Sequence, residues 1–427
     1  MTNALHERRV AAGGPDAALA TTVATTDPRP IAKAAARVRI DSVDLLRGLI
    51  MAIMMLDHTR DFVHRDALSF DATDVARTFP MLFFTRWITH FCAPLFVFLA
   101  GTAASFQEMR GRSKAELSRL LVTRGLWLVA IELFVLRPLV FFNFHYGELL
   151  FFFQVIWAIG CSMIALAAII HLPRSWVIAL SVAVIVLHNT LDDVRVTGFG
   201  ASLWQVLHQQ GPIFPFGTPG PTVFVMYPLV PWIAVMSAGY AFGWLYREPE
   251  PERRRELVLL GTTLVLCFII LRAINVYGDP VPWTAQFGGT KTILSFLALR
   301  KYPPSLLYLL MTLGPGILFL AFAERHTRGR LAHVLITYGR VPFFFYLLQW
   351  VMAHSLALAA AWLAGKPTAY LFSNFGLAGP LPPADGIGFG LPMVYFVWLL
   401  GLVLLYPLCR WFAEVKATRR DWWLSYL

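Results

Sequence analysis

Long apolar runs alternate with short polar links along most of this chain. A helix needs about 20 mostly apolar residues to cross a bilayer, and on that criterion the sequence predicts about ten membrane-spanning helices. They are expected at residues 45–64, 82–106, 119–141, 149–171, 175–190, 222–246, 256–276, 305–323, 334–363 and 391–412. We therefore predict an all-α fold, a polytopic integral membrane helix bundle. The ninth segment is long enough to tilt or break.

Basic residues are concentrated in alternate links between these segments. The basic links lie before residue 45, at 107–118, at 172–174, at 247–255, at 324–333 and after residue 412. Lys and Arg mark the cytoplasmic side of a membrane protein, so both termini are predicted to be cytoplasmic. The opposite links are longer and more acidic or aromatic. Loops of that length can cover a cavity or recognise a substrate.

The composition supports the membrane interpretation. Of 427 residues, 57% are hydrophobic and only 14% are charged, and the mean hydropathy is +0.61, too apolar for a soluble protein of this size. The excess of 36 Lys and Arg over 25 Asp and Glu lies mainly in the short links, so we predict no nucleic acid partner. Residues 1–38 form a polar stretch rich in Pro, Ala and Thr, which predicts a disordered cytoplasmic tail, and residues 39–427 are predicted to form a single transmembrane domain.

The best catalytic candidates lie at the outer end of the first apolar segment. Asp57, Asp61 and His64 are spaced i, i+4 and i+7, which places them on one helix face, while His58 points roughly 100° away. A carboxylate beside an imidazole orients the ring and raises its basicity, as a general base requires. The same groups could form structural ion pairs with neighbouring arginines or hold a metal ion. Because a third firm ligand is lacking, and the four cysteines have no paired spacing, we predict no metal site.

Further ionisable residues lie within predicted membrane segments. Arg86 and His90 are one helical turn apart, and the functional interpretation of His90 competes with that of an ordinary core histidine. Arg124 and Arg340 lie near the inner ends of their segments. They could meet a phosphate group that arrives from the cytoplasm, although snorkelling towards the membrane surface explains them equally well. The chain carries no Walker loop, dinucleotide fingerprint, nucleophile elbow or zinc motif.

Several longer motifs resemble one known family. RVRIDSVDLLRG, which contains Arg39, Ser42, Asp44, Arg47 and Gly48, resembles the R-x-x-S-x-D-x-x-R-G entry to the first helix of the heparan-α-glucosaminide N-acetyltransferase catalytic-domain family. Four other stretches resemble the bacterial branch of that family, a group of membrane proteins of unknown function within the transmembrane acyltransferases. They are RWITHFCAPLFVFLAG (86–101), YPLVPWIAVMSAGYAFG (227–243), KYPPSLLYLLMTLGP (301–315) and YGRVPFFFYLLQ (338–349). The resemblance extends over roughly residues 39–411.

The resemblance implies an acyltransferase that takes an acetyl group from cytoplasmic acetyl-CoA and delivers it to an amino sugar across the membrane. In the lysosomal relatives, an asparagine near the end of the first helix and a histidine in the following loop belong to the active site. His58 stands at the position of that asparagine, and His64 is our candidate for the second imidazole. His90 stands where those relatives carry an aspartate.

We therefore predict a membrane-embedded acyltransferase that moves an acetyl or other acyl group from cytoplasmic acyl-CoA to an amine or hydroxyl of a sugar-like acceptor on the extracytoplasmic side. The candidate catalytic residues are Asp57, His58, Asp61, His64, Arg86 and His90, and the candidate ligands of the CoA phosphates are Arg124 and Arg340. Expected partners are the lipid bilayer, acetyl-CoA and a carbohydrate or amino-sugar acceptor, and we also consider a homodimer. The expected location is a bacterial inner (plasma) membrane. The alternative is a proton-coupled secondary transporter that uses its intramembrane acids and histidine.

Overall fold

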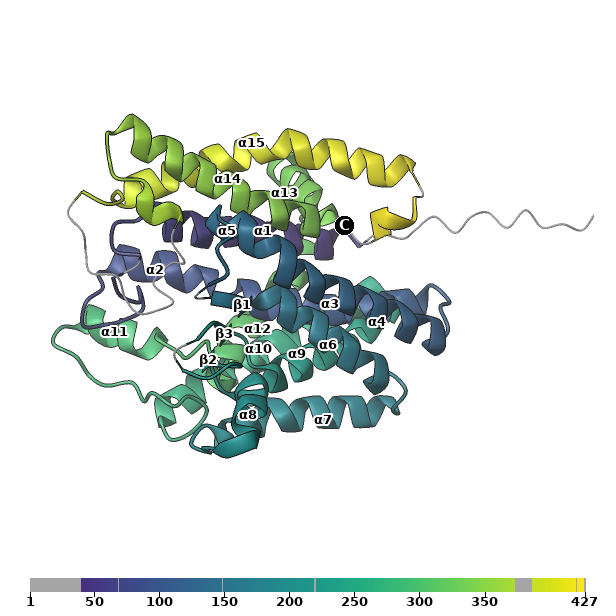
Figure 1. Cartoon of the computed structure of the whole chain (residues 1–427). Helices are drawn as coiled ribbons and strands as arrows, with labels where there is room; N and C mark the ends of the chain where they lie inside the picture. The colour runs from purple at the N-terminus through teal and green to yellow at the C-terminus, as the bar shows by residue number, and fades with distance from the viewer. Residues whose placement is uncertain are drawn as a thin grey trace, which may run out of the picture. The chain divides into compact units, whose positions relative to one another are not determined.

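The computed structural model describes residues 40–67, 69–147, 149–218, 220–372, 386–419 and 421–425. Residues 40–427 form one compact unit, and these described residues are mostly helical (Figure 1). The predicted tail of residues 1–38 lies outside the described residues.

The helices follow the predicted apolar runs closely. Their bounds are α1 Asp41–Val63, α2 Pro80–Thr89, α3 Cys92–Met109, α4 Lys114–Ile131, α5 Arg137–Phe141, α6 Val155–Ile169, α7 Arg174–Leu187, α8 Ala201–His208, α9 Leu229–Phe242, α10 Glu250–Ile274, α11 Gly289–Leu297, α12 Leu306–Ala323, α13 Arg330–Arg340, α14 Pro342–Leu363 and α15 Leu391–Thr418. Within the described part of the chain, seven helical segments are long and apolar enough to cross a membrane, namely 80–109, 174–191, 229–247, 250–274, 306–323, 342–363 and 391–418. The protein is thus a polytopic helical membrane protein.

Three of the predicted spans are not among these seven segments. The first corresponds to α1, which carries several charged side chains, and the third corresponds to α4 and α5, which are joined by a π-helical turn at Glu132–Leu136. The fourth contains α6, which has only 15 residues. The predicted ninth segment does break, because α13 ends at Arg340 and α14 begins at Pro342, where proline cannot donate the next helical hydrogen bond.

The prediction of an all-α fold is wrong in one respect, since the described residues also form a three-stranded sheet. Its strands are β1 Leu149–Phe153, β2 Gly211–Ile213 and β3 Thr222–Val225, in the order β1-β3-β2. β1 pairs parallel with β3, and β2 pairs antiparallel with it. The sequences LLFFF and TVFV are rich in aromatic and β-branched residues, which favour extended backbone. These strands are as apolar as a membrane helix, so hydropathy alone does not separate the two. The fourth and sixth predicted spans therefore wrongly include β1 and β3 at their N-terminal ends.

Glycines bring the central helices into backbone contact. A Cβ atom on Gly48 of α1 would lie 1.7 Å from the carbonyl oxygen of Leu335 on α13, and one on Gly339 would lie 1.8 Å from that of Asp44. α3 and α9 cross in the same way at Gly101 and Gly239. Small residues at such crossings are typical of helix packing in membranes, and here they fix α1 and α3 beside their neighbours.

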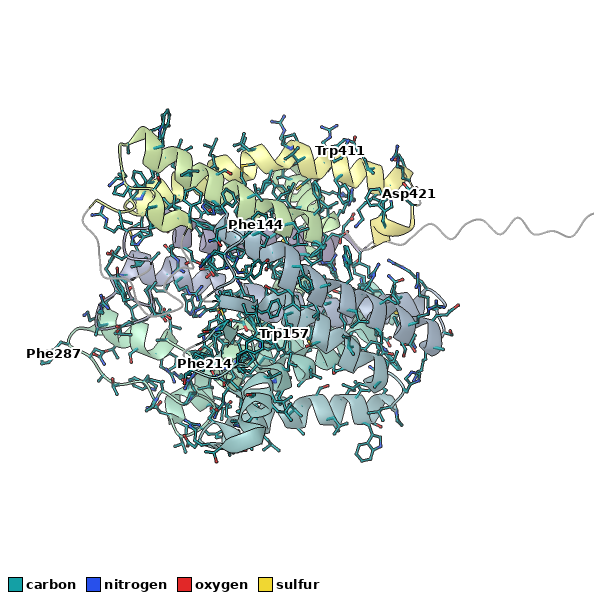
Figure 2. All side chains as sticks on the ribbon, viewed as in Figure 1. Phe144, Trp157, Phe214, Phe287, Trp411 and Asp421 are labelled. Atoms are coloured by element: carbon teal, nitrogen blue, oxygen red, sulfur yellow. The ribbon has the colours of Figure 1, made fainter. Side chains whose placement is uncertain are left out.

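The outer faces of several helices are apolar. On α15, Trp411 is 58% exposed and Val403 is 69% exposed, whereas Trp157 on α6 is only 5% exposed (Figure 2). α10 similarly exposes Ile270 and Leu259. Apolar surface of this extent on a whole helix face is expected where lipid covers it. The exposed apolar faces therefore agree with a membrane location.

Candidate functional site

A cavity of about 660 Å³ surrounds the C-terminal end of α1. We call it the outer cavity, because this end of α1 is the one predicted to be extracytoplasmic. Its polar and aromatic lining residues include Asp57, His58, Arg60, Asp61, Phe70, Asp71, Arg86, Gln154, Gln210, Tyr227, Lys301, Tyr302 and Trp350. They come from α1, α2, the sheet region, α14 and two long links. Residues far apart in the sequence thus form one chamber that gathers several charged side chains inside the apolar bundle.

Two arginines and two aspartates form an ion-pair network in this cavity. Asp57 contacts Nη1 of Arg86 through both carboxylate oxygens, at 2.7 and 2.5 Å, and Nη2 of Arg60 at 3.2 Å. The same Nη2 of Arg60 contacts Asp61 at 2.5 Å. Asp57 is therefore shared between two guanidinium groups, with Asp61 supplying the second negative charge, and Asp57 is poorly suited to accept a proton or to bind a metal ion.

His58 is the histidine that lines the outer cavity. Its ring centroid lies 3.6 Å from that of Trp350, and its Nδ1 atom has no hydrogen-bond partner among the described residues. The sequence predicted that Asp57 and Asp61 share a helix face with His64 and that His58 points away from them. In the structure, the His58 ring packs against the Trp350 indole at an interplanar angle of 36°.

His64 and His90 do not line the cavity. His64 follows the last residue of α1, is 7% exposed, and accepts a hydrogen bond on Nδ1 from the Asp66 amide at 3.2 Å. His90 lies between α2 and α3, and its carbonyl accepts a hydrogen bond from the Tyr308 hydroxyl at 2.7 Å. The structure therefore brings together four of the six predicted catalytic residues, and these two histidines are not among the lining residues.

Sequence reasoning did not assign two charged residues that complete this site. Lys301 lines the cavity from the link before α12, and Asp71 lines it from the link before α2. Burial raises the pKa of Asp71, but the Arg86 guanidinium and two hydrogen bonds from Thr73 outweigh burial and lower that pKa. In the sequence, Lys301 is only the first residue of the KYPPSLLYLLMTLGP motif, because spacing along the chain cannot show that it meets α1.

Glu132 and Arg137 do not pair with each other. Glu132 accepts a hydrogen bond on Oε2 from the Trp157 amide at 3.1 Å, at the start of α6. Arg137 donates to backbone carbonyls that include those of Leu149 and His145. Both side chains thus hold the β1 region in place beside the outer cavity.

A second cavity, of about 360 Å³, lies around the N-terminal half of α1. We call it the inner cavity. Its cationic lining residues are Arg47, Arg124, Arg340 and Lys416, and apolar side chains such as Leu99 make up most of the remaining wall. Arg124 and Arg340, which the sequence nominated together, line this same cavity. A cationic end and an apolar wall suit a ligand that combines phosphate groups with a less polar arm.

The two cavities are neighbours within the bundle. Phe96 and Val155 line both of them. On α1, Arg47 lines the inner cavity and His58 lines the outer one, and eleven residues of helix correspond to roughly 16 Å. On α14, Tyr346 lines the inner cavity and Trp350, one helical turn later, lines the outer one. The cationic pocket and the His58 ring therefore lie in adjacent cavities along α1, at a separation of molecular length.

Comparison with known proteins identifies one family. The family model described as heparan-alpha-glucosaminide N-acetyltransferase, catalytic, matches residues 39–277, more than half of the chain. The match includes the α1 and α2 sides of the outer cavity and Arg124 of the inner one. It ends before the motifs that contain Lys301 and Arg340. No curated protein matches the chain.

Proposed function

Because the chain belongs to the heparan-α-glucosaminide N-acetyltransferase catalytic family, we propose that it transfers an acetyl or related acyl group across the membrane. Members of this family use acetyl-CoA as the donor. The donor is cytoplasmic acetyl-CoA in the inner cavity, and the acceptor is an amine or hydroxyl of a sugar-like molecule in the outer cavity. The observation that carries this proposal is that Phe96 and Val155 line both cavities.

The inner cavity supports the assignment of a CoA donor. Arg124, Arg340, Arg47 and Lys416 supply the positive charge that the nucleotide phosphates need. Arg47 and Arg340 are oriented by nearby acids, since Arg47 contacts Asp44 at 3.0 Å and Arg340 contacts Asp41 at 3.4 Å. The apolar wall beyond them suits the pantetheine arm, which would carry the thioester towards Phe96.

The outer cavity supports the assignment of a polar, hydroxyl-rich acceptor. Asp61, Asp71 and Lys301 provide acceptors and donors of hydrogen bonds around its wall, and Tyr302 and Trp350 provide aromatic faces. Sugars present alternating hydroxyl groups and apolar ring faces, so this mixture of charged and aromatic side chains matches them. Amino sugars and neutral polyols both match this lining.

His58 is the general base in this proposal. It takes a proton from the acceptor amine or hydroxyl, and the nitrogen or oxygen then forms a bond to the acyl carbon of the thioester. Arg86 donates a hydrogen bond to the oxygen that becomes negatively charged in the tetrahedral intermediate. The carbon–sulfur bond breaks, and the CoA thiolate leaves and takes up the proton that His58 holds. Asp57 keeps Arg86 in place through the ion pair.

His64 and His90 are positioning residues in this mechanism. His64 ends α1 and holds the turn that follows it, and His90 joins α2 to α3 beside Tyr308. Asp61 keeps Arg60 directed at Asp57. Each of these residues therefore acts on the cavity wall and not on the reacting atoms.

We further propose about ten membrane crossings with both termini in the cytoplasm. The seven long apolar segments make seven of these crossings, and α1, α4 and α6 make the other three. Residues 39–427 then form one transmembrane acyltransferase domain. The bacterial branch resembled by the motifs suggests an inner (plasma) membrane. A homodimer is compatible with the exposed apolar faces of α10 and α15.

Purified protein in lipid nanodiscs tests the activity. It is incubated with acetyl-CoA that carries a labelled acetyl group and with a panel of amino sugars and neutral sugars, and label transfer and free CoA thiol are both measured. We expect CoA release that depends on one class of acceptor and that His58→Ala abolishes. His333→Gln, at an exposed histidine of α13, is the matched control. CoA release that no acceptor stimulates, or that His58→Ala leaves unchanged, would overturn the proposal.

A proton-coupled transporter is the second candidate, and the observation that favours it is the network of Asp57, Asp61, Arg60 and Arg86 in a cavity within the bundle. Ionisable groups at that depth also serve proton relays. Proteoliposomes separate the two functions. Solute accumulation driven by a pH gradient, in the absence of any acyl-CoA, would favour the transporter and contradict the acyltransferase.

A further inference from the structure

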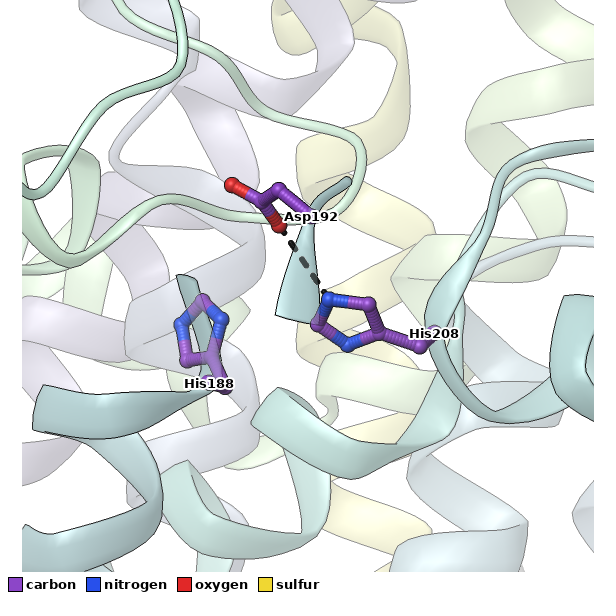
Figure 3. A group of neighbouring side chains, drawn as sticks. All are labelled: His188, Asp192 and His208. Atoms are coloured by element: carbon purple, nitrogen blue, oxygen red, sulfur yellow. Dashed lines mark hydrogen bonds and ion pairs between the residues drawn. The ribbon is translucent and has the colours of Figure 1, made fainter. Parts of the chain in front are cut away.

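A cluster of two histidines and one aspartate lies outside both cavities. His188 begins the short 3-10 turn His188–Leu191 that follows α7, Asp192 comes directly after that turn, and His208 is the last residue of α8. Each side chain offers one ligand atom, and these atoms all lie within 4.8 Å of one another (Figure 3). Among the described residues, this is the one group of three such side chains close enough to share an ion.

The two histidines are buried without enough hydrogen-bond partners. His188 is 2% exposed, and neither of its ring nitrogens has a hydrogen-bond partner among the described residues. His208 is 1% exposed, its Nε2 contacts Asp192 Oδ1 at 3.1 Å, and its Nδ1 has no partner among the same residues. An imidazole nitrogen buried without a partner is unfavourable. A metal ion that accepts the lone pair of one nitrogen of each ring removes part of that penalty.

The carboxylate is oriented by surrounding groups. Asp192 Oδ2 accepts a hydrogen bond from Asn189 Nδ2 at 2.8 Å, and Asn189 Oδ1 in turn accepts one from the Leu306 amide at 2.8 Å. Arg195 donates to the Asp192 carbonyl, and the Trp204 ring packs against His208 with centroids 5.3 Å apart. Outer partners of this kind orient metal ligands in proteins.

We propose that His188, Asp192 and His208 bind a divalent transition-metal ion of the Zn²⁺ type. Two imidazole nitrogens and one carboxylate oxygen suit zinc and its neighbours, whereas Mg²⁺ and Ca²⁺ prefer oxygen ligands alone. Ligand atoms around tetrahedral zinc are about 3.3 Å apart, so the side chains close slightly on the ion. Water or a carbonyl completes the coordination.

From the sequence we predict no metal site, whereas in the structure these three side chains lie together. His188 and Asp192 are separated by one helical turn, which is a recognisable ligand spacing. The third ligand lies beyond a loop and a separate helix, and chain spacing gives no reason to associate it with the first two. The structure supplied that association.

The ion would act as a structural clamp. It joins the end of α7 to the end of α8, and Asn189 links the cluster to the start of α12. His208 is two residues before Gln210, which lines the outer cavity. Metal binding therefore fixes the link that forms one wall of that cavity, and the proposal stands independently of the reaction catalysed there.

The test uses the full chain in detergent, purified without a polyhistidine tag, treated with a chelator and then dialysed against Zn²⁺. We expect about one Zn²⁺ per chain by elemental analysis, a higher unfolding temperature with Zn²⁺ than after chelation, and affinity at least about 100-fold weaker in His188→Gln and His208→Gln. Asn189→Ala, which removes only the outer partner, should weaken binding about 10- to 100-fold. His333→Gln is the control and should bind as the unmodified chain does.

A second measurement does not depend on any variant. Co²⁺ added to the metal-free chain should give visible absorption bands typical of nitrogen and oxygen coordination, and Zn²⁺ should displace them. No cobalt bands and no Zn²⁺-dependent change in unfolding temperature would overturn the proposal. Equal Zn²⁺ uptake by the unmodified chain and by folded His188→Gln would also overturn it.

Discussion

Asp57 on α1 and Arg86 on α2 form an ion pair in which one guanidinium nitrogen contacts both carboxylate oxygens, at 2.7 and 2.5 Å. The two side chains are only 11% and 12% exposed. Arg60, one helical turn after Asp57, adds a second contact. The pair explains how charged residues persist within an apolar bundle, and it links the first two helices of the protein directly.

Asp57→Ala should destabilise the protein by about 3–5 kcal/mol, because it leaves two buried guanidinium groups without their shared carboxylate. Thermal unfolding in detergent measures the effect. Asp193→Ala, at an exposed position, is the control and should change the unfolding temperature little. The double variant Asp57→Ala/Arg86→Met should recover part of the lost stability, since it also removes the Arg86 charge that Asp57 no longer pairs, whereas Arg60 keeps its contact with Asp61. Additive losses in the double variant would show that the two side chains do not act as a pair.

His58→Ala should lower kcat about 10²- to 10⁴-fold while leaving the KM for acetyl-CoA nearly unchanged, because a general base acts on the reacting proton and not on the nucleotide. His64→Ala should retain most of the rate, since His64 lies outside the cavity. The comparison requires equal amounts of folded protein, checked by size-exclusion chromatography. Equal rate losses in the two variants would contradict the assignment of His58 as the base.

The sequence predicted the helices well, because the tendency of an apolar run to enter a membrane depends on its own residues. It misassigned Leu149–Phe153 and Thr222–Val225, where strand pairing between distant segments determines the structure. The charged residues of α1 and α2 were also recognised, since burial of charge is visible in the sequence itself.

Other parts of the site were beyond prediction for physical reasons. The i, i+7 spacing placed His64 on the face of Asp57, but α1 ends at Val63 and His64 has extended backbone angles, so helical phase no longer applies to it. Lys301 and Trp350 reach the outer cavity only through tertiary packing. No local pattern indicates which side chains such packing brings to α1.

Arg124→Gln and Arg340→Gln should each raise the KM for acetyl-CoA about 10- to 100-fold, with a smaller effect on kcat, because each removes a charge-assisted contact to a phosphate group. Arg330→Gln, on an exposed part of α13, is the control. Acetyl-pantetheine lacks the nucleotide phosphates, so its KM should not change in either variant. A similar rise for both donors would indicate general damage to the inner cavity and would contradict the phosphate assignment.

Gly48→Ala should destabilise the protein by about 1–3 kcal/mol or more, because the added methyl group would lie 1.7 Å from the Leu335 carbonyl oxygen and force α1 away from α13. Gly289→Ala, at the start of α11, has no atom within 4 Å of the added Cβ and serves as the control. Thermal unfolding in detergent compares the two. Equal unfolding temperatures for the two variants would show that the contact between α1 and α13 yields easily.

Asp279 should give the protein a stability that depends on pH. This residue lies in the link after α10, where its Oδ2 accepts hydrogen bonds from the Ser305 hydroxyl at 2.6 Å and from the Arg300 amide at 2.9 Å. Burial raises the pKa of Asp279, and these hydrogen bonds oppose burial without cancelling it. The folded protein therefore holds the proton of this carboxyl more tightly than the unfolded chain does.

The sign of the effect follows from that difference. A raised pKa in the folded state contributes stability that is fully present below the ordinary aspartate pKa and is lost as pH rises through the raised value. Asp279→Asn does not titrate at this position, so the difference in unfolding temperature between the unmodified chain and this variant isolates the contribution. We expect the difference to favour the unmodified chain most at or below the ordinary aspartate pKa and to shrink as pH rises through the raised pKa, because the buried carboxyl then loses its proton. A difference that stays constant or grows with pH would mean that the hydrogen bonds from Ser305 and Arg300 outweigh burial.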